Sequence, residues 1–184
     1  ETRAERAARE SRFTLDDFQS EDEPMRTCLE LARAAARTDL PLLILGETGT
    51  GKTILAHALH NSSSRTKAPF VAFNAAALSD TLIDSQLFGH EKGAFTGADR
   101  RPKGKFEQAD GGTLFVDEIA DMSLSAQAKI LRAVEYGEFE RLGSEALLQV
   151  DVRLIAATHH PITRFLADDQ FRRDLFYRVS GITL

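Results

Sequence analysis

One short segment combines glycines, a lysine and a threonine at a spacing that suits phosphate binding. Residues 46–53 read Gly-Glu-Thr-Gly-Thr-Gly-Lys-Thr, which matches the Walker A pattern G-x-x-x-x-G-K-[ST]. An apolar run at 42–45 precedes the segment and helical periodicity follows it, so we expect a strand, a turn and a helix. Glycines let backbone N–H groups converge on phosphate oxygens at a helix N-terminus, where the helix dipole favours an anion. The pattern predicts a nucleoside triphosphate site; a tight glycine turn without a ligand is the alternative.

The side chains of this segment have separate expected roles. The Lys52 ammonium group would reach the terminal phosphates, and the Thr53 hydroxyl would be a ligand of Mg²⁺. The residues expected to contact the nucleotide are Gly46, Glu47, Thr48, Gly49, Thr50, Gly51, Lys52 and Thr53.

Two acidic residues directly follow another apolar run. Leu114-Phe-Val116 leads into Asp117 and Glu118. Acidic side chains at the end of a buried strand are costly unless they serve a cation or a ligand, and parallel α/β sheets bind ligands at those strand ends. In this Walker B arrangement, Asp117 would hold Mg²⁺ through water and Glu118 would orient the attacking water. A helix-capping acidic pair is the alternative.

Phosphoryl transfer also needs a cationic group that stabilises the developing charge. The candidates are Arg172, Arg173 and Arg178. Arg172 and Arg178 are six residues apart, a spacing that need not place both in one site of the same subunit, so a neighbouring subunit could supply one or both. A solvated basic helix face is the alternative. Thr158, just beyond an apolar run, is another polar group expected at the ligand edge of the sheet.

Composition limits the remaining possibilities. The 184 residues suit a single domain, and a net charge of −5 argues against a duplex DNA-binding surface. Any DNA contact would come through a partner or another part of a longer protein. One cysteine excludes an internal disulfide, and the five scattered histidines lack a paired metal spacing, so no catalytic zinc is expected. The apolar runs are strand-sized, which predicts no membrane span and favours a cytoplasmic protein.

The order of elements predicts the fold class. Residues 1–23 are highly charged and favour a linker or helical lead-in over a core element. Expected strands are 41–45, 70–73, 113–116, 152–157 and the start of a fifth at 182–184. Expected helices are 24–37, 52–61, a short one after Ser79, 124–136 and 171–177. Strands that alternate with helices predict an α/β fold with a mostly parallel five-stranded sheet covered on both faces.

Three further stretches carry a specific resemblance: residues 70–78, Leu87-Phe-Gly-His-Glu-Lys-Gly-Ala-Phe-Thr-Gly-Ala98 and residues 104–119. Over roughly residues 40–184 the chain resembles the central AAA+ ATPase domain of sigma-54-dependent transcriptional activators, the bacterial enhancer-binding proteins of the nitrogen-regulator type. The discriminating element is residues 93–98, because other AAA+ clades share the two Walker motifs but not this insertion. The resemblance implies a P-loop NTPase three-layer sandwich, with residues 24–184 forming the large α/β subdomain of the sigma-54 interaction domain.

The resemblance also implies a partner. Glycines bound a Phe-Thr tip in the insertion, so an apolar ring can be presented on a flexible arm. This loop is implied to contact sigma-54 RNA polymerase and to couple ATP hydrolysis to remodelling of the closed promoter complex. The expected partner-binding residues are Gly93, Ala94, Phe95, Thr96, Gly97 and Ala98, with Arg141 assisting from a second loop at 138–143. An ordinary surface turn with Phe95 folded into the core is the alternative.

Further roles are implied position by position. Asn74 matches a switch partner for Glu118, and Thr158 lies at the sensor I position. Arg172 and Arg178 match arginine fingers that act between subunits. The resemblance therefore implies an ATPase, with ATP and Mg²⁺ as cofactors, that is active only as an oligomer, most simply a hexameric ring.

Departures from the family pattern concern four positions. Thr53 replaces a common Glu and restores the general nucleotide-binding pattern, while His159 stands where Asn is usual; Ala75 and Gln86 replace a common Cys and Glu. The family's helical lid, a sensory domain and a helix-turn-helix module are expected outside these residues. A scaffold that binds nucleotide without hydrolysing it, and an AAA+ remodeller of another clade, are the alternative functions.

Overall fold

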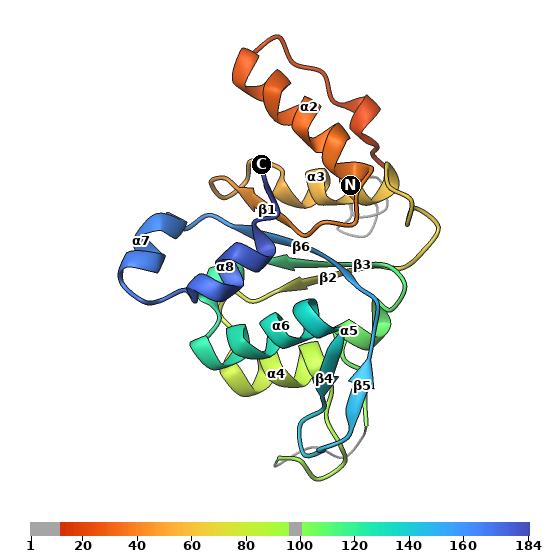
Figure 1. The fold of residues 1–184 in the computed structure, drawn as a ribbon, viewed down its shortest axis with the longest axis vertical. Coiled ribbons are helices and arrows are strands. Elements are labelled where there is room, and N and C mark those ends of the chain that lie inside the picture. The colour runs from red at the N-terminus through yellow and green to blue at the C-terminus, as the bar shows by residue number, and fades with distance from the viewer. Residues whose placement is uncertain (1–11, 96–100) are drawn as a thin grey trace.

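A five-stranded parallel sheet forms the centre of the molecule (Figure 1). The computed structural model describes residues 12–95 and 101–184. The strands lie in the order β2-β3-β6-β1-β7 and all pair in parallel. Their bounds are β1 Leu42–Leu45, β2 Phe70–Asn74, β3 Thr113–Asp117, β6 Arg153–Thr158 and β7 Ile182–Thr183. The predicted α/β class is confirmed, and the five predicted strands agree with the observed ones to within one residue at each end.

Helices cover both faces of the sheet (Figure 1). On one face, alternate strand residues such as Leu42, Ile44 and Phe115 pack against α2 and α3. On the other face, Leu114 and Val116 belong to a larger core shared with α4, α6 and α8. Because both faces are covered, the central strands are continuous apolar runs rather than alternating ones.

The long helices begin and end at recognisable signals. Asp22 caps α2, accepting a hydrogen bond from the Met25 N–H at 3.1 Å, and Ser123 caps α6. Gly137 ends α6 in the left-handed conformation that glycine adopts at low cost. The bounds are α2 Glu23–Ala36, α3 Lys52–Asn61, α4 Asp80–Phe88, α6 Leu124–Tyr136 and α8 Arg173–Val179. No helix among the described residues is both long and apolar enough to cross a membrane.

Four short elements were not expected from the sequence. They are α5 Lys105–Gln108, α7 Ile162–Ala167, and the antiparallel pair of β4 Glu138–Glu140 with β5 Leu147–Gln149. The second loop predicted at 138–143 is therefore one strand and the turn of a hairpin. Short 3₁₀ turns lie at η1 Leu15–Asp17 and η2 Ile119–Asp121. Elements of three to six residues leave too little periodicity in the sequence to be recognised.

The segment before α2 belongs in part to the packed domain. Leu15 is buried against α2 and α3, and its N–H donates to the Ser62 hydroxyl at 3.0 Å. The Asn61 side chain donates to the Phe13 carbonyl at 2.7 Å, and Arg33 donates to the Leu15 carbonyl at 3.3 Å. The expectation that residues 1–23 contain no core element is wrong at Leu15, because charged neighbours masked this single apolar anchor.

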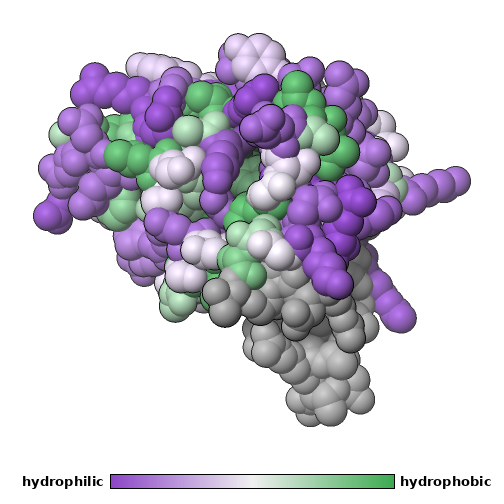
Figure 2. All heavy atoms as spheres, turned by 90° about the horizontal axis from the view of Figure 1, so that it is seen from below, coloured by the Kyte–Doolittle hydropathy of each residue, from purple (hydrophilic) through white to green (hydrophobic). Residues whose placement is uncertain are grey.

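The face that carries the β4–β5 hairpin is largely polar. Seen from that end, hydrophilic residues dominate and apolar residues form separate small patches (Figure 2). Scattered apolar side chains of this kind are normal on a protein surface.

His60 is a buried titratable residue between α3 and β3. The side chain is almost completely buried, and its Nδ1 lies 2.9 Å from the Thr113 hydroxyl. Burial lowers its pKa below the ordinary value of about 6.5, because desolvation disfavours the charged ring.

We therefore expect the stability contributed by neutral His60 to be complete above pH 6.5 and to be lost as the pH falls below it, since the unfolded chain binds the proton first. In urea unfolding between pH 7.5 and 5.5, His60→Gln should lose less stability on acidification than the wild-type protein. Identical pH slopes for the two proteins would contradict this assignment.

Candidate nucleotide site

The predicted phosphate loop lies between the end of β1 and the start of α3. Gly49 and Gly51 have φ of 85° and 92°, in the left-handed region that favours glycine. Gly51 is also the N-cap of α3, and no side chain caps this helix. The first-turn N–H groups of a helix have no partner within it. The local geometry therefore fits an anion such as a phosphate.

Lys52 lies within this loop. Its ammonium group donates to the carbonyls of Gly46 at 2.8 Å and Glu47 at 2.9 Å. The Thr50 hydroxyl also donates to the Glu47 carbonyl, at 2.8 Å. The lysine charge is thus held at the loop by polar groups although the side chain is only 8% exposed.

A cleft of about 470 Å³ joins the phosphate loop to the ends of the neighbouring strands. It brings together residues from the loop, from β2, from β3 and from the segment after β6. Its lining residues are Thr48, Gly49, Gly51, Lys52, Thr53, Ile54, Asn74, Ala76, Asp117, Glu118 and His159. The two Walker motifs therefore meet at the carboxyl edge of the sheet, as the sequence predicts.

Asp117 is the last residue of β3. Its Oδ1 accepts the Glu118 N–H at 3.1 Å, and its Oδ2 accepts the Asn74 side chain at 3.4 Å. Burial and the neighbouring Glu118 charge raise its pKa, whereas Lys52 opposes the shift. A carboxylate that is costly to bury beside another negative charge is suited to a divalent cation, and the Thr53 side chain lines the same cleft. These residues fit Mg²⁺.

Glu118 has an unusual backbone and an unexpected partner. Its φ of 55° is left-handed, which is uncommon for a residue other than glycine. Its Oε2 accepts two hydrogen bonds from His159, one from Nδ1 at 2.7 Å and one from the backbone N–H at 3.1 Å. Burial raises the pKa of Glu118, but the His159 hydrogen bonds and the nearby Lys52 charge act in the opposite direction, and the pKa lies below its ordinary value.

The expected switch pair is not formed in this structure. Among the described residues, the Asn74 side chain donates to Asp117 and not to Glu118. His159 takes that place, a role that the residue pattern alone did not predict. Its position directly after Thr158, at the ligand edge of the sheet, is the signal that could have identified it.

Thr158, the last residue of β6, is completely buried next to the site. Its carbonyl accepts the Gly46 N–H at 3.3 Å, and its hydroxyl accepts the His160 N–H at 3.1 Å. It does not line the cleft. Its contacts therefore hold the phosphate loop and the segment after β6 in register.

The two predicted finger arginines lie away from the cleft of their own chain. Arg172 forms a two-pronged ion pair with Asp174, at 3.0 and 2.7 Å. Arg178 donates to the Val134 carbonyl at 3.1 Å. Neither side chain lines the cleft. Arg172 is the N-cap of α8 and Arg178 lies in its last turn. Their role in the site of a neighbouring subunit stays a prediction.

The predicted partner loop is described up to Phe95. Gly93 has a φ of 82°, and the half-buried Phe95 ring packs edge-on against His90 at 4.8 Å. His90 in turn lies 2.8 Å from the Ser85 hydroxyl. Phe95 thus packs on a neighbouring ring but belongs to neither of the two hydrophobic core clusters. Thr96, Gly97 and Ala98 lie outside the described residues.

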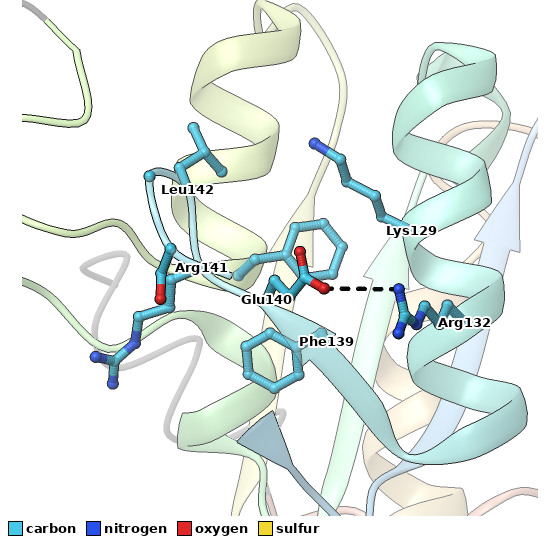
Figure 3. A pocket seen from close by; sticks show the side chains of 9 residues that line it. Lys129, Arg132, Phe139, Glu140, Arg141 and Leu142 are labelled. Atoms are coloured by element: carbon cyan, nitrogen blue, oxygen red, sulfur yellow. Dashed lines mark ion pairs between the residues drawn. The ribbon is translucent and has the colours of Figure 1, made fainter. Parts of the chain in front are cut away.

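Arg141 is occupied within the chain. It forms an ion pair with Glu107 at 2.6 Å and another with Glu91 at 3.2 Å, and its side chain is 11% exposed. Figure 3 shows its guanidinium directed away from a cleft of about 330 Å³ beside α6 and β4, where Arg132 pairs with Glu140 at 3.7 Å. In this structure Arg141 ties the hairpin to the base of the partner loop.

The fold and the cleft together define a P-loop NTPase of the α/β class. A solved P-loop NTPase domain of the sigma-54 transport activator from E. coli shares the fold, with a TM-score of 0.55 at 16% identity over 80% of this chain and 97% of that chain. NtrX from Brucella abortus in complex with ATP is closer, with a TM-score of 0.84 at 33% identity over 98% of this chain and 38% of that chain.

The family follows from the sequence comparison. The model of the sigma-54 interaction domain matches residues 18–184, so the chain belongs to this family. The Nif-specific regulatory protein of Enterobacter agglomerans is 49% identical over 91% of this chain and 32% of its own length. The DNA-binding transcriptional regulator NtrC of Escherichia coli K12 is 50% identical over 90% of this chain and 35% of its own length. The chain thus spans about a third of the curated relatives it matches.

Gly51 holds a left-handed backbone conformation in the phosphate loop. An added Cβ would meet no atom within 4 Å, so the only cost of Gly51→Ala is the left-handed backbone, about 1–2 kcal/mol. If the loop relaxes to avoid this strain, nucleotide affinity should fall about tenfold.

Gly111→Ala is the matched control, because Gly111 has a φ of 76°, equally open space and a position outside the cleft. Both variants should be destabilised in thermal unfolding, and only Gly51→Ala should weaken binding of a fluorescent ADP analogue. If the two variants bind the ADP analogue with equal affinity, the phosphate loop does not contribute to nucleotide binding.

Proposed function

We propose that this chain is the ATP-hydrolysing core of a transcriptional activator that remodels the sigma-54 RNA polymerase closed complex through residues 93–98. The observation that carries the proposal is the single cleft that Lys52, Asp117 and Glu118 share. Its family, and the ATP complex of the related NtrX, support ATP as the nucleotide.

The residues of the cleft have distinct tasks in this proposal. Lys52 exchanges its two carbonyl partners for oxygens of the terminal phosphates. Thr53 and, through water, Asp117 would hold Mg²⁺, which would supply positive charge to the phosphates. Glu118 accepts a hydrogen bond from the attacking water and directs it at the terminal phosphate.

The cationic group that the cleft lacks would come from another subunit. Within one chain the described lining provides Lys52 as its only lysine or arginine. Arg172 and Arg178 are half-exposed or exposed, and their partners are an aspartate and a carbonyl that they can exchange. We propose that they enter the site of a neighbouring subunit, which makes a ring, most simply a hexamer, necessary for hydrolysis.

Force transmission would run through the partner loop. Residues 93–98, with Phe95 and Thr96 at the tip, would contact sigma-54, and Arg141 would hold the stem of the loop. DNA would be bound by a separate domain, because the net charge of −5 does not suit a duplex surface.

The role of Glu118 separates an ATPase from a nucleotide-binding scaffold. Glu118→Gln should lower the rate of phosphate release by about 10²–10⁴-fold and leave ADP affinity unchanged, because the amide cannot take up the proton of the water. Glu135→Gln, an exposed substitution on α6, should behave as wild type. Equal phosphate release by the wild-type and Glu118→Gln proteins would favour the scaffold.

The role of Phe95 separates a sigma-54 activator from an AAA+ remodeller of another clade. Phe95→Ala should retain ATPase activity but lose capture of sigma-54 in the presence of an ADP–metal-fluoride mimic of the transition state. Met25→Ala removes an exposed apolar side chain from α2, outside the loop, and should retain capture. Undiminished capture by Phe95→Ala would exclude the proposed contact.

A further inference from the structure

The carboxylate of Glu118 is oriented by a single residue, His159. Both His159 hydrogen bonds, from Nδ1 at 2.7 Å and from the backbone N–H at 3.1 Å, go to Oε2. Among the described residues, no hydrogen bond to the other oxygen, Oε1, accompanies them. Since Glu118 and His159 both line the nucleotide cleft, this arrangement leaves Oε1 for a water molecule there.

The His159 ring is itself supported by a stack of aromatic rings. Its centroid lies 4.0 Å from that of His160, which lies 4.5 Å from that of Phe165 on α7. His160 is fixed at both ends, because its N–H donates to Thr158 and its Nε2 lies 2.6 Å from the Asp121 carboxylate. We call His159, His160 and Phe165 the ring stack. It connects α7 and η2 to the Glu118 carboxylate.

The same residues could be considered as metal ligands. One ligand atom from each of Glu118, His159 and His160 lies within 4.8 Å of the other two. However, each imidazole already has its own carboxylate, Glu118 for His159 and Asp121 for His160. Two separate acid–imidazole pairs, rather than three open ligands, favour orientation of the carboxylate.

We propose that His159 is a positioning residue for ATP hydrolysis, which fixes Oε2 of Glu118 so that Oε1 faces the attacking water. The inference rests on the proposed role of Glu118. Its physical basis is that Glu118 precedes η2 with a left-handed backbone, and both donors that reach its carboxylate bind the same oxygen, so they set the direction of the side chain. Displacement of a catalytic carboxylate by about 1 Å can lower the reaction rate by up to a hundredfold.

Two amide substitutions of His159 test whether Nδ1 or Nε2 of the ring is the nitrogen that must reach Glu118. The amide nitrogen of asparagine occupies nearly the same place as Nδ1 of histidine, whereas that of glutamine resembles Nε2. We expect His159→Ala and His159→Gln to lower kcat about tenfold, because the backbone N–H still holds Oε2. His159→Asn should restore most of the activity. ADP affinity and KM should change little in all three, and a purely structural role would not produce this difference between Asn and Gln.

A double-substitution experiment shows whether His159 acts through Glu118. Combined with Glu118→Gln, His159→Ala should cause no further loss of single-turnover hydrolysis, because the group that it positions is already absent. A further tenfold loss in the double variant, or wild-type or faster hydrolysis by His159→Ala alone, would overturn the inference. Equal rates for Asn, Gln and Ala at position 159 would do the same.

These outcomes are distinct from a failure of the proposed function. If Glu118→Gln hydrolyses ATP at the wild-type rate, the ATPase proposal fails and the inference fails with it. If Glu118→Gln is inactive while His159→Ala is fully active, only the inference fails. Thermal unfolding of every variant distinguishes a variant that fails to fold from a folded variant in which the Glu118 carboxylate is displaced. His160→Phe, which keeps a ring in the stack but loses the Asp121 contact, should retain more activity than His160→Ala.

Discussion

Parallel pairing of the central strands is the constraint on which the nucleotide site depends. In a parallel sheet all carboxyl ends emerge at one edge. The register places Asn74 of β2 opposite Asp117 of β3, and Leu45 of β1 opposite Thr158 of β6. The Gly46 N–H continues this pairing one residue further by donating to the Thr158 carbonyl. The phosphate loop, both acidic residues and His159 are therefore brought together by backbone hydrogen bonds rather than by their own attraction.

The price of this arrangement is that charged groups are buried, and each is compensated locally. Lys52 and Glu118 are only 8% and 7% exposed. The lysine donates to two loop carbonyls, and the glutamate accepts two hydrogen bonds from His159. Buried charges without such partners would destabilise the fold strongly. The same hydrogen bonds hold the side chains in place in advance of binding, which is the property that a catalytic site needs.

At the other end of the molecule, ion pairs hold the base of the partner loop. Glu91, just before the loop, pairs with Arg101 at 2.8 Å just after it, and also with Arg141 of the hairpin. A β-bridge between Gly89 and Lys103 lies immediately outside these pairs. The described residues on the two sides of the loop are thus tied to each other and to the hairpin.

The phosphate loop, the acidic strand end and the parallel sheet could be predicted from the sequence, because glycine spacing and continuous apolar runs are local signals. The sequence did not predict α5, α7 or the β4–β5 hairpin, which are too short to show periodicity, nor the burial of Leu15 within a charged segment. The contact of Glu118 with His159, rather than with Asn74, is visible only in the folded chain. That choice depends on how the segment after β6 turns across the end of β3, and residues 41 positions apart in the chain carry no mark of their contact.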